Sequence, residues 1–128
     1  MRSLRMWILL ALLGLTAGCG NRSREDANDL DARLASRKSF DSVVFTSLQS
    51  TNVFSVDEVH VLNAFFAQTN RLTAPDPGKA QILGVLSFIQ GTNEEVRMFL
   101  CRGSVWEYGS YCFRLSVQPP ILRFAFPE

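Results

Sequence analysis

The chain has 128 residues, of which 47% are hydrophobic and 20% are charged, and its formal net charge at pH 7 is +1. A chain of this length forms one small domain with a single hydrophobic core. Because the net charge is so close to zero, the composition argues against a nucleic-acid partner and gives no reason to expect a polybasic contact with a membrane surface.

The first element along the chain has the pattern of an export signal. Arg2 and Arg5 precede an uncharged and mostly apolar run over Met6–Leu15, and small residues follow before Cys19. This order is typical of a secretory signal peptide. The apolar run is shorter than the roughly 20 residues that a membrane-spanning helix needs. We therefore expect residues 1–18 to be a signal peptide and not a transmembrane helix.

The segment Thr16-Ala17-Gly18-Cys19 resembles the lipobox of bacterial lipoproteins. Thr16 departs from the family pattern, which prefers Leu there. The resemblance implies that the mature chain begins at Cys19, that its sulfur carries a diacylglycerol, and that fatty acids such as palmitate anchor it in the cell envelope, facing the periplasm. Two or more acyl chains hold a protein stably on a membrane. Because Gly20 and not Asp follows the cysteine, the resemblance favours an outer over an inner membrane in a cell that has both. The alternative is an ordinary secretory signal cut nearby, with Cys19 as a spare cysteine.

The next segment, Gly20–Lys38, is polar, and Leu30 and Leu34 are its chief large apolar residues. Such a composition buries too little apolar surface to offset the entropy of ordering the chain. We expect residues 19–38 to be the lipidated cysteine and a polar tether. The alternative is a short helix that docks through Leu30 and Leu34.

A single globular domain is expected over residues 39–128. The β-branched and aromatic residues of Phe40–Leu48 predict a strand. Ser55 and Glu58 then form a capping box, which predicts the start of an amphipathic helix over Val56–Asn70. Arg71 suits the negative end of that helix dipole. The apolar side of the helix carries Val56, Val59, Leu62, Phe65 and Phe66.

The rest of the chain reads as strands. Thr73–Lys79 is expected to be a loop, and the next segment, Gln81–Ile89, is apolar on both faces, as a central strand can be. Alternation of apolar and polar residues then predicts strands over Val96–Arg102 and Tyr111–Val117, and a last strand after Pro119-Pro120. Together these elements predict an α+β fold, in which one amphipathic helix packs on an antiparallel sheet of four or five strands in the order β-α-β-β-β-β. The sheet face under the helix is expected to carry Val96, Met98, Leu100, Phe113, Leu115, Phe124 and Phe126.

Cys101 and Cys112 fall on the other face of the predicted sheet. An even pair of cysteines in an exported protein predicts a disulfide. Direct pairing of the two would also set Phe99 opposite Arg114, within reach of a cation–π contact. The alternative register turns at Gly103-Ser104, sets Cys101 opposite Trp106 and leaves the thiols apart. The sequence favours neither metal nor cofactor, because it has a single histidine and no Cys-x-x-Cys spacing.

Two groups of residues are candidates for binding. Arg97, Phe99, Arg114 and Arg123 would share the open sheet face and form an anion-binding or protein-binding surface. Trp106 and Tyr108 lie in a glycine-flanked segment and could be exposed anchors for a partner. The alternatives are a solvated sheet face in the first case and a short extra hairpin packed on the sheet in the second.

Catalytic chemistry has little support in the sequence. It contains no Gly-x-Ser-x-Gly motif and no phosphate-binding glycine loop, and His60 beside Asp57 on a helix is common surface chemistry. We therefore expect a non-catalytic, lipid-anchored envelope domain that binds another protein or an envelope component through its open sheet face or its Trp106 segment. Two alternatives stay open: a periplasmic inhibitor or immunity-type protein that blocks a hydrolase, and a small hydrolase that uses His60.

Overall fold

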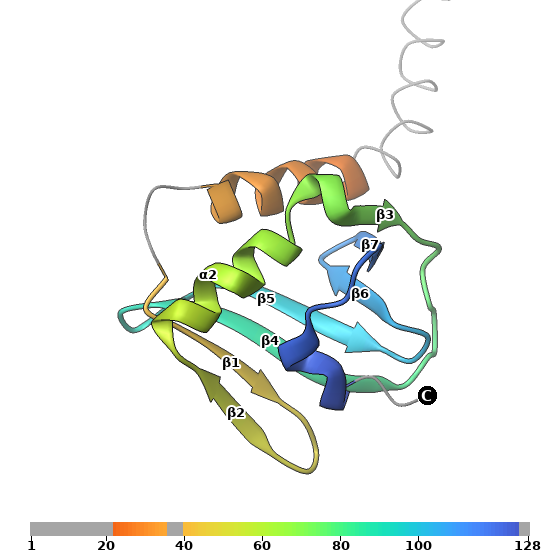
Figure 1. Ribbon diagram of the computed structural model, residues 1–128. Helices are drawn as coiled ribbons and strands as arrows, with labels where there is room; N and C mark the ends of the chain where they lie inside the picture. The colour runs from red at the N-terminus through yellow and green to blue at the C-terminus, as the bar shows by residue number, and fades with distance from the viewer. Residues whose placement is uncertain (1–21, 36–39, 126–128) are drawn as a thin grey trace, which may run out of the picture.

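The computed structural model describes residues 22–35 and 40–125, which form an α+β fold with helices on an antiparallel sheet (Figure 1). The fold class is as predicted, but the sheet has seven strands and not four or five, in the order β2-β1-β4-β5-β6-β7-β3. Every neighbouring pair is antiparallel. The strands are β1 (Ser42–Thr46), β2 (Thr51–Phe54), β3 (Arg71–Thr73), β4 (Ile82–Gln90), β5 (Asn93–Cys101), β6 (Val105–Tyr108) and β7 (Tyr111–Leu115).

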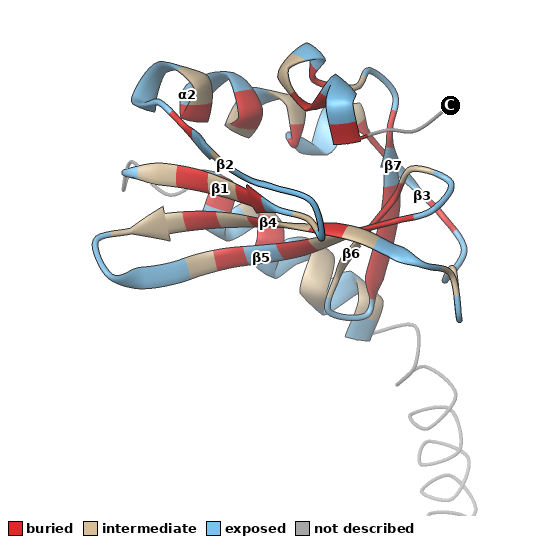
Figure 2. Cartoon of the chain, turned by 90° about the horizontal axis from the view of Figure 1, so that it is seen from below, coloured by how far each residue is buried: buried red, intermediate tan, exposed pale blue. Residues whose placement is uncertain are grey.

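The helical elements are α2 (Val56–Phe65), the 3-10 turns η1 (Gln68–Asn70) and η2 (Pro120–Ala125), and a helix over residues 22–35. In Figure 1, α2 and the helix of residues 22–35 lie side by side above the sheet. Figure 2 shows that buried residues gather where the helices and the sheet face each other. One continuous core cluster includes residues of both helices and of the strands beneath them.

The start of α2 is the capping box that the sequence predicts. The Ser55 backbone N–H donates to the Glu58 carboxylate at 2.9 Å, and the Glu58 backbone N–H donates to the Ser55 hydroxyl at 3.4 Å. The hydrogen bond from the Ser55 backbone lowers the pKa of Glu58. These bonds satisfy amide groups that a helix N-terminus would otherwise leave unpaired.

The helix ends at Phe65, five residues before the expected end at Asn70. The Asn70 side-chain amide donates to the Phe65 carbonyl at 2.9 Å, and its oxygen accepts from the Val117 N–H at 3.0 Å. Asn70 therefore caps the helix and ties the next segment to the chain beyond β7. The result is the short edge strand β3, which starts at Arg71, a residue that the sequence placed at the end of the helix.

The predicted inner face of the sheet is confirmed for the five residues of β5 and β7, all of which are buried: Val96, Met98, Leu100, Phe113 and Leu115. Phe66, just past the end of α2, joins the layers. Its ring lies edge-on to three sheet residues, at centroid distances of 6.2 Å from Phe88, 5.0 Å from Trp106 and 6.2 Å from Phe113.

The last predicted strand is wrong, because residues Pro120–Ala125 form the 3-10 turn η2. Leu122 and Ala125 are both buried, and their spacing of three residues fits a 3-10 turn, which a strand would not allow. Phe124 is 55% exposed and does not lie in the core, although its ring lies edge-on to Phe45 at 5.7 Å. Phe126 falls outside the described residues.

Residues 22–35 are a docked helix and not the tether that their composition suggests. Leu30 is fully buried and Leu34 is 8% exposed, which is the alternative that the sequence left open. The Asn63 side chain of α2 donates to the Leu34 carbonyl at 3.2 Å, and Arg33 donates to the Glu95 carbonyl of β5 at 2.7 Å. Two buried leucines and polar contacts to both layers thus hold the helix on the domain.

The substitution Leu30→Ala should lower the free energy of unfolding by about 2–5 kcal/mol, because it leaves a cavity under a fully buried side chain. Chemical denaturation of the purified protein measures this change. The control is Glu25→Ala on the exposed side of the same helix, which should stay within about 0.5 kcal/mol of the parent. If Leu30→Ala behaves like Glu25→Ala, the helix does not dock as described.

Candidate functional site

The sheet face turned away from the helices, called the open face below, carries side chains that continue from strand to strand. Residues that pair directly across strands point to the same face. Successive cross-strand partners therefore form two rows of side chains on this face. The first row runs across β2, β1, β4 and β5, and the second runs across the same four strands and then across β6 and β7. The first row is Val53, Val44, Ser87 and Arg97, and the second is Thr51, Thr46, Val85, Phe99, Glu107 and Cys112.

The half of the open face over β2, β1, β4 and β5 carries apolar side chains and one cation, with Thr46, Thr51 and Ser87 among them. Its apolar residues and the cation are called the β2–β5 patch below: Val44, Val53, Val85, Arg97 and Phe99. Val53 is 68% exposed. The Arg97 guanidinium lies 5.8 Å from the centre of the Phe99 ring, and its Nε lies 3.4 Å from a Glu94 carboxylate oxygen. Arg97 and Phe99, both predicted as binding residues, are therefore in contact.

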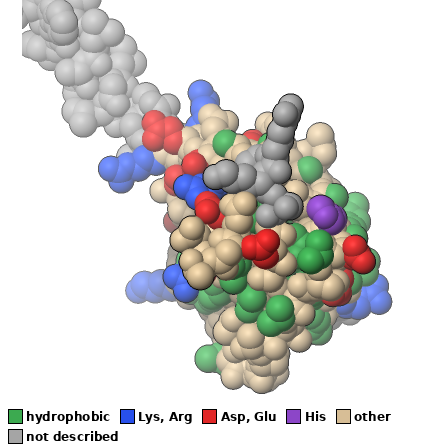
Figure 3. All heavy atoms as spheres, turned by 90° about the vertical axis from the view of Figure 1, so that its left-hand side faces the viewer, with side chains coloured by type: hydrophobic (Ala, Val, Ile, Leu, Met, Phe, Trp, Pro, Cys, Tyr) green, Lys and Arg blue, Asp and Glu red, His purple; other side chains and the backbone are tan. Residues whose placement is uncertain are grey.

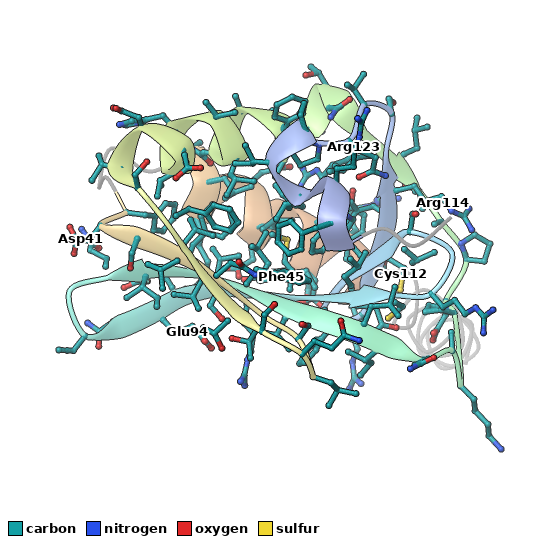
Figure 4. The ribbon with its side chains drawn as sticks, turned by 60° about the horizontal axis from the view of Figure 1, so that its bottom comes forward. Asp41, Phe45, Glu94, Cys112, Arg114 and Arg123 are labelled. Atoms are coloured by element: carbon teal, nitrogen blue, oxygen red, sulfur yellow. The ribbon has the colours of Figure 1, made fainter. Side chains whose placement is uncertain are left out.

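The other two predicted arginines do not join this patch. Arg114 is exposed on β7, where it pairs with Leu72 and donates from Nε to the Gly103 carbonyl at 3.2 Å. Phe99 pairs with Glu107 and not with Arg114, so the expected cation–π partner is replaced by Arg97. Arg123 belongs to η2, a different element from the sheet (Figure 4). The structure thus brings together two of the four residues that the sequence grouped.

Trp106 and Tyr108 lie on the added strand β6, so the alternative of an extra hairpin packed on the sheet is the correct one. Trp106 has no exposed surface and is not an exposed anchor. Tyr108 is half-buried, and its hydroxyl donates to the Asp29 carboxylate of the helix over residues 22–35. Burial, together with this bond, raises the pKa of Tyr108 to about 12. Both aromatic residues therefore help to join elements of the fold.

The expected direct pairing of Cys101 with Cys112 is wrong. Cys101 pairs with Val105 and Cys112 pairs with Glu107, so β6 lies between the two cysteine strands. Strands two positions apart are about 9–10 Å from each other, whereas a disulfide needs Cα atoms within about 7 Å. The chain turns at Gly103-Ser104, as in the alternative register, but Cys101 lies opposite Val105 and not opposite Trp106, a difference of one residue. Both cysteines are free and buried.

The two thiols lie beneath the β3–β4 connection, residues 74–81, which crosses the open face. The Ala74 N–H donates to the Cys112 carbonyl at 3.0 Å, and the Arg102 N–H donates to the Gln81 carbonyl at 2.8 Å. This crossing brings Asp76 to the cysteines. The sulfur of Cys112 and carboxylate oxygens of Asp76 and Glu107 all lie within 4.8 Å of one another. These residues and Cys101 form what we call the thiol–carboxylate cluster.

The cluster makes both cysteines weak acids. Burial raises the pKa of Cys101, and the negative charge of the nearby Glu107 carboxylate raises it further. Burial raises the pKa of Cys112 to about 11, with additional contributions from Glu107 and Asp76. Both thiols are therefore protonated at neutral pH, which makes them poor nucleophiles.

Arg71 is a buried cation that sequence reasoning missed, because its position predicted the end of a helix. Its side chain is 1% exposed, and its Nη2 forms an ion pair with the Asp31 carboxylate of the helix over residues 22–35. The guanidinium lies 5.4 Å from the Tyr111 ring centre and 5.6 Å from that of Phe113. Burial lowers its pKa. Only the packed fold reveals this position, since nothing in the local sequence distinguishes Arg71 from a surface arginine.

His60, the candidate for hydrolytic chemistry, lies exposed on α2. Figure 3 shows the histidine at the surface, close to hydrophobic and acidic side chains. It belongs to the helical layer, whereas the β2–β5 patch and the thiol–carboxylate cluster lie on the open face. The structure therefore places His60 apart from both.

Comparison with family models, with curated proteins and with solved structures gave no match for this chain. Within residues 22–35 and 40–125, no helix has both the length and the apolar character needed to cross a membrane. Cys19 and the rest of the predicted export signal lie outside the described residues. The site therefore has to be interpreted from its own geometry.

The bond between Tyr108 and Asp29 should be detectable by titration. The Tyr108 hydroxyl, more than Arg33, holds the pKa of Asp29 below its ordinary value. Tyr108→Phe should raise that pKa and lower the free energy of unfolding at pH 7 by about 1 kcal/mol, a small loss because Asp29 is about half exposed. Because the folded pKa of Asp29 is lowered, its contribution is present above the unfolded pKa and is lost as the pH falls through the folded one.

Carboxyl NMR titration gives the pKa of Asp29, and denaturation at pH 7 and at acidic pH gives the stability. The control is Tyr111→Phe, which alters a buried tyrosine on the neighbouring strand and should leave the pKa of Asp29 unchanged. An unshifted Asp29 in Tyr108→Phe would show that the hydrogen bond is absent in solution.

Proposed function

We propose that this chain is an envelope lipoprotein anchored through Cys19, and that its folded domain is a non-catalytic module that binds a protein partner through the β2–β5 patch. The lipobox-like segment Thr16–Cys19 supports the anchor. The observation that carries the binding role is the β2–β5 patch, because it combines the exposed Val53, half-buried valines and a half-buried aromatic ring with an arginine on one sheet face.

The composition of the patch suits a protein partner better than a lipid surface. Aromatic residues and arginine are enriched at protein–protein interfaces, with apolar contacts at their centre. The charge of Arg97 is offset by Glu94, so the patch does not have the several uncompensated cations that attract anionic lipids. The β2 strand adds a second feature, because it is an edge of the sheet and its outer backbone groups can pair with an extended segment of a partner.

The docked N-terminal helix supports a position close to the membrane. The described helix begins at residue 22, three residues after Cys19. Three residues span at most about 11 Å even when fully extended. A lipid on Cys19 would therefore hold the domain at the bilayer surface, so the partner that we propose is a membrane protein or a protein bound close to the membrane.

The anchor is tested by mass spectrometry of the protein purified from the membranes of its native cell. We expect a chain that begins at Cys19 and carries fatty acids there, and we expect Cys19→Ala to remain as an unprocessed or non-lipidated form. Thr16→Leu is the matched control, because it introduces the preferred lipobox residue and should be processed at least as well as the parent. An intact leader or an unmodified Cys19 thiol in the parent would contradict the anchor.

The binding role is tested by placing a photo-crosslinking residue at Val53, which is exposed in the patch. Val61, which is 45% exposed on α2, is the matched control in the other layer. In intact cells we expect a discrete adduct with an envelope protein from Val53 and none from Val61. A single hydrolase as the captured partner would identify the domain as an inhibitor. Equal labelling from both positions, or no adduct from Val53, would contradict the patch as the binding surface.

A further inference from the structure

We propose that the thiol–carboxylate cluster of Cys101, Cys112, Glu107 and Asp76 is a binding site for a single thiophilic divalent cation, with zinc as the expected ion. This inference goes beyond the proposed function, and it depends on neither the lipid anchor nor the β2–β5 patch. It reverses the expectation from sequence, which disfavoured a metal because the chain has one histidine and no Cys-x-x-Cys motif.

The geometry brings ligand atoms together from three separate parts of the chain. Cys112 lies on β7, Glu107 lies opposite it on β6, and Asp76 comes from the β3–β4 connection. Their ligand atoms lie within 4.8 Å of one another. Ligand atoms around a tetrahedral zinc ion, at about 2.0–2.3 Å from the metal, are about 3.3–3.8 Å apart. A contraction of at most about 1.5 Å would therefore complete the coordination of these three groups.

Cys101 lies beside these three residues, but its sulfur is not among the ligand atoms that lie within 4.8 Å of one another. It shares a buried cluster with Cys112, Val105 and Ala74, and we propose that it supplies the fourth ligand after a local shift. Cys112 is 7% exposed, and its sulfur faces the carboxylate oxygens. Figure 4 shows Cys112 at the end of the sheet opposite Glu94. Cys112, Glu107 and Asp76 give three donor groups, and Cys101 would make four, the number that a closed tetrahedral site requires.

The charges of the site also favour a cation. Within the described part of the chain, every ion pair involves an acid other than Asp76 and Glu107. Asp76 is exposed and Glu107 is half-buried, so two carboxylates lie beside a buried thiol, and neither of them forms an ion pair with an arginine or lysine of the described residues. A divalent cation would supply the positive charge and would convert the thiols to thiolates, releasing their protons to solvent.

The choice of ion follows from the donor atoms. Thiolate sulfur selects zinc, copper(I) and iron–sulfur centres, whereas calcium and magnesium prefer sites made wholly of oxygen. The oxygens of Asp76 and Glu107 favour the divalent ion zinc over copper(I). The Asp76 carboxylate is already oriented, because one of its oxygens accepts from the Gly78 N–H at 2.8 Å, which leaves the other free to bind.

A disulfide between Cys101 and Cys112, which remains a prediction from the sequence, is the rival use of the same sulfur atoms. The two uses exclude each other, because a disulfide sulfur has no thiolate to offer a metal. Their consequences also differ in geometry. A disulfide requires the sulfur atoms of two non-adjacent strands to approach to about 2 Å across β6, whereas two sulfur ligands of one zinc ion stay about 3.8 Å apart.

The test uses the full chain with Cys19→Ala, so that Cys101 and Cys112 are the two thiols present. The protein is purified under reducing conditions, stripped of metal and titrated with cobalt(II), a spectroscopic substitute for zinc. We expect one ion per chain, a sulfur-to-cobalt charge-transfer band, loss of that band when zinc is added, and a higher melting temperature with zinc, because a ligand that binds the folded state stabilises it.

Glu107→Gln and Asp76→Asn should weaken cobalt binding by about tenfold or more, since even partners outside the ligand sphere have effects of this size. Glu94→Gln is the matched control, because Glu94 also contributes to the open face but lies at the other end of the sheet. It should bind cobalt like the parent. Cys112→Ser should abolish the charge-transfer band.

The parent protein alone keeps the proposal falsifiable if a variant fails to fold. The absence of a cobalt–thiolate band at stoichiometric metal would overturn the site. So would a band that is weakened equally by Glu94→Gln and Glu107→Gln. A Cys101–Cys112 disulfide in protein isolated from its native cell without reductant, found by mass spectrometry, would also overturn it in favour of the rival.

Discussion

The aromatic contact at Phe66 is the point on which the two layers of this protein depend. Its ring meets Phe88, Trp106 and Phe113, which belong to three different strands. A ring in this position fixes where α2 can end, and the cap from Asn70 then directs the chain into β3. The contact also decides the orientation of the sheet, because every residue that alternates with these aromatic residues must point to the open face. Both candidate sites are consequences of that orientation.

Local patterns in the sequence predicted the elements that local physics controls. The capping box located the start of α2, and the alternation in β5 and β7 identified the inner face correctly. The edge strands β2 and β3 were missed, because runs of four and three residues are too short to show a period. The final segment was misread because Leu122, Phe124 and Phe126 alternate, whereas burial follows Leu122 and Ala125. Leu30 and Leu34 were too few for composition to reveal a docked helix.

The candidate sites show where sequence reasoning stops. The faces of Cys101 and Cys112 were predicted correctly, but the register was not, because the tight turn at Gly103 and Ser104 adds β6 between their strands. Both turn residues have positive φ, 88° and 61°. Asp76 could not be associated with the cysteines, because only the crossing of the β3–β4 connection brings it there. The Asp76-Pro77-Gly78 turn was visible in the sequence, but a turn does not identify its neighbours.

The open face has two parts with different physical characters. Over β2, β1, β4 and β5 its side chains are accessible, so this part suits recognition. Over β5, β6 and β7 the connection of residues 74–81 shields the thiols, whose raised pKa values keep them protonated. On the inner side, Gly84 allows the Phe45 ring to lie directly against the backbone of β4, where a Cβ atom would overlap it. The inner side of the sheet is thus closely packed, and its open face is divided between the β2–β5 patch and the thiol–carboxylate cluster.

The placement of the N-terminal helix also determines when this protein can complete its fold. The helix leaves the ribosome before the rest of the described domain. It contacts Asn63 and Arg71 in the middle of the chain, but it also contacts Glu95, Tyr108 and Ser110 farther along. Likewise, β3 pairs with β7 and with no earlier strand in the described structure. A polypeptide made or translocated from its N-terminus therefore cannot complete the packing of this helix until its last quarter is present. Such a dependence on late-arriving partners delays the final closure of the domain.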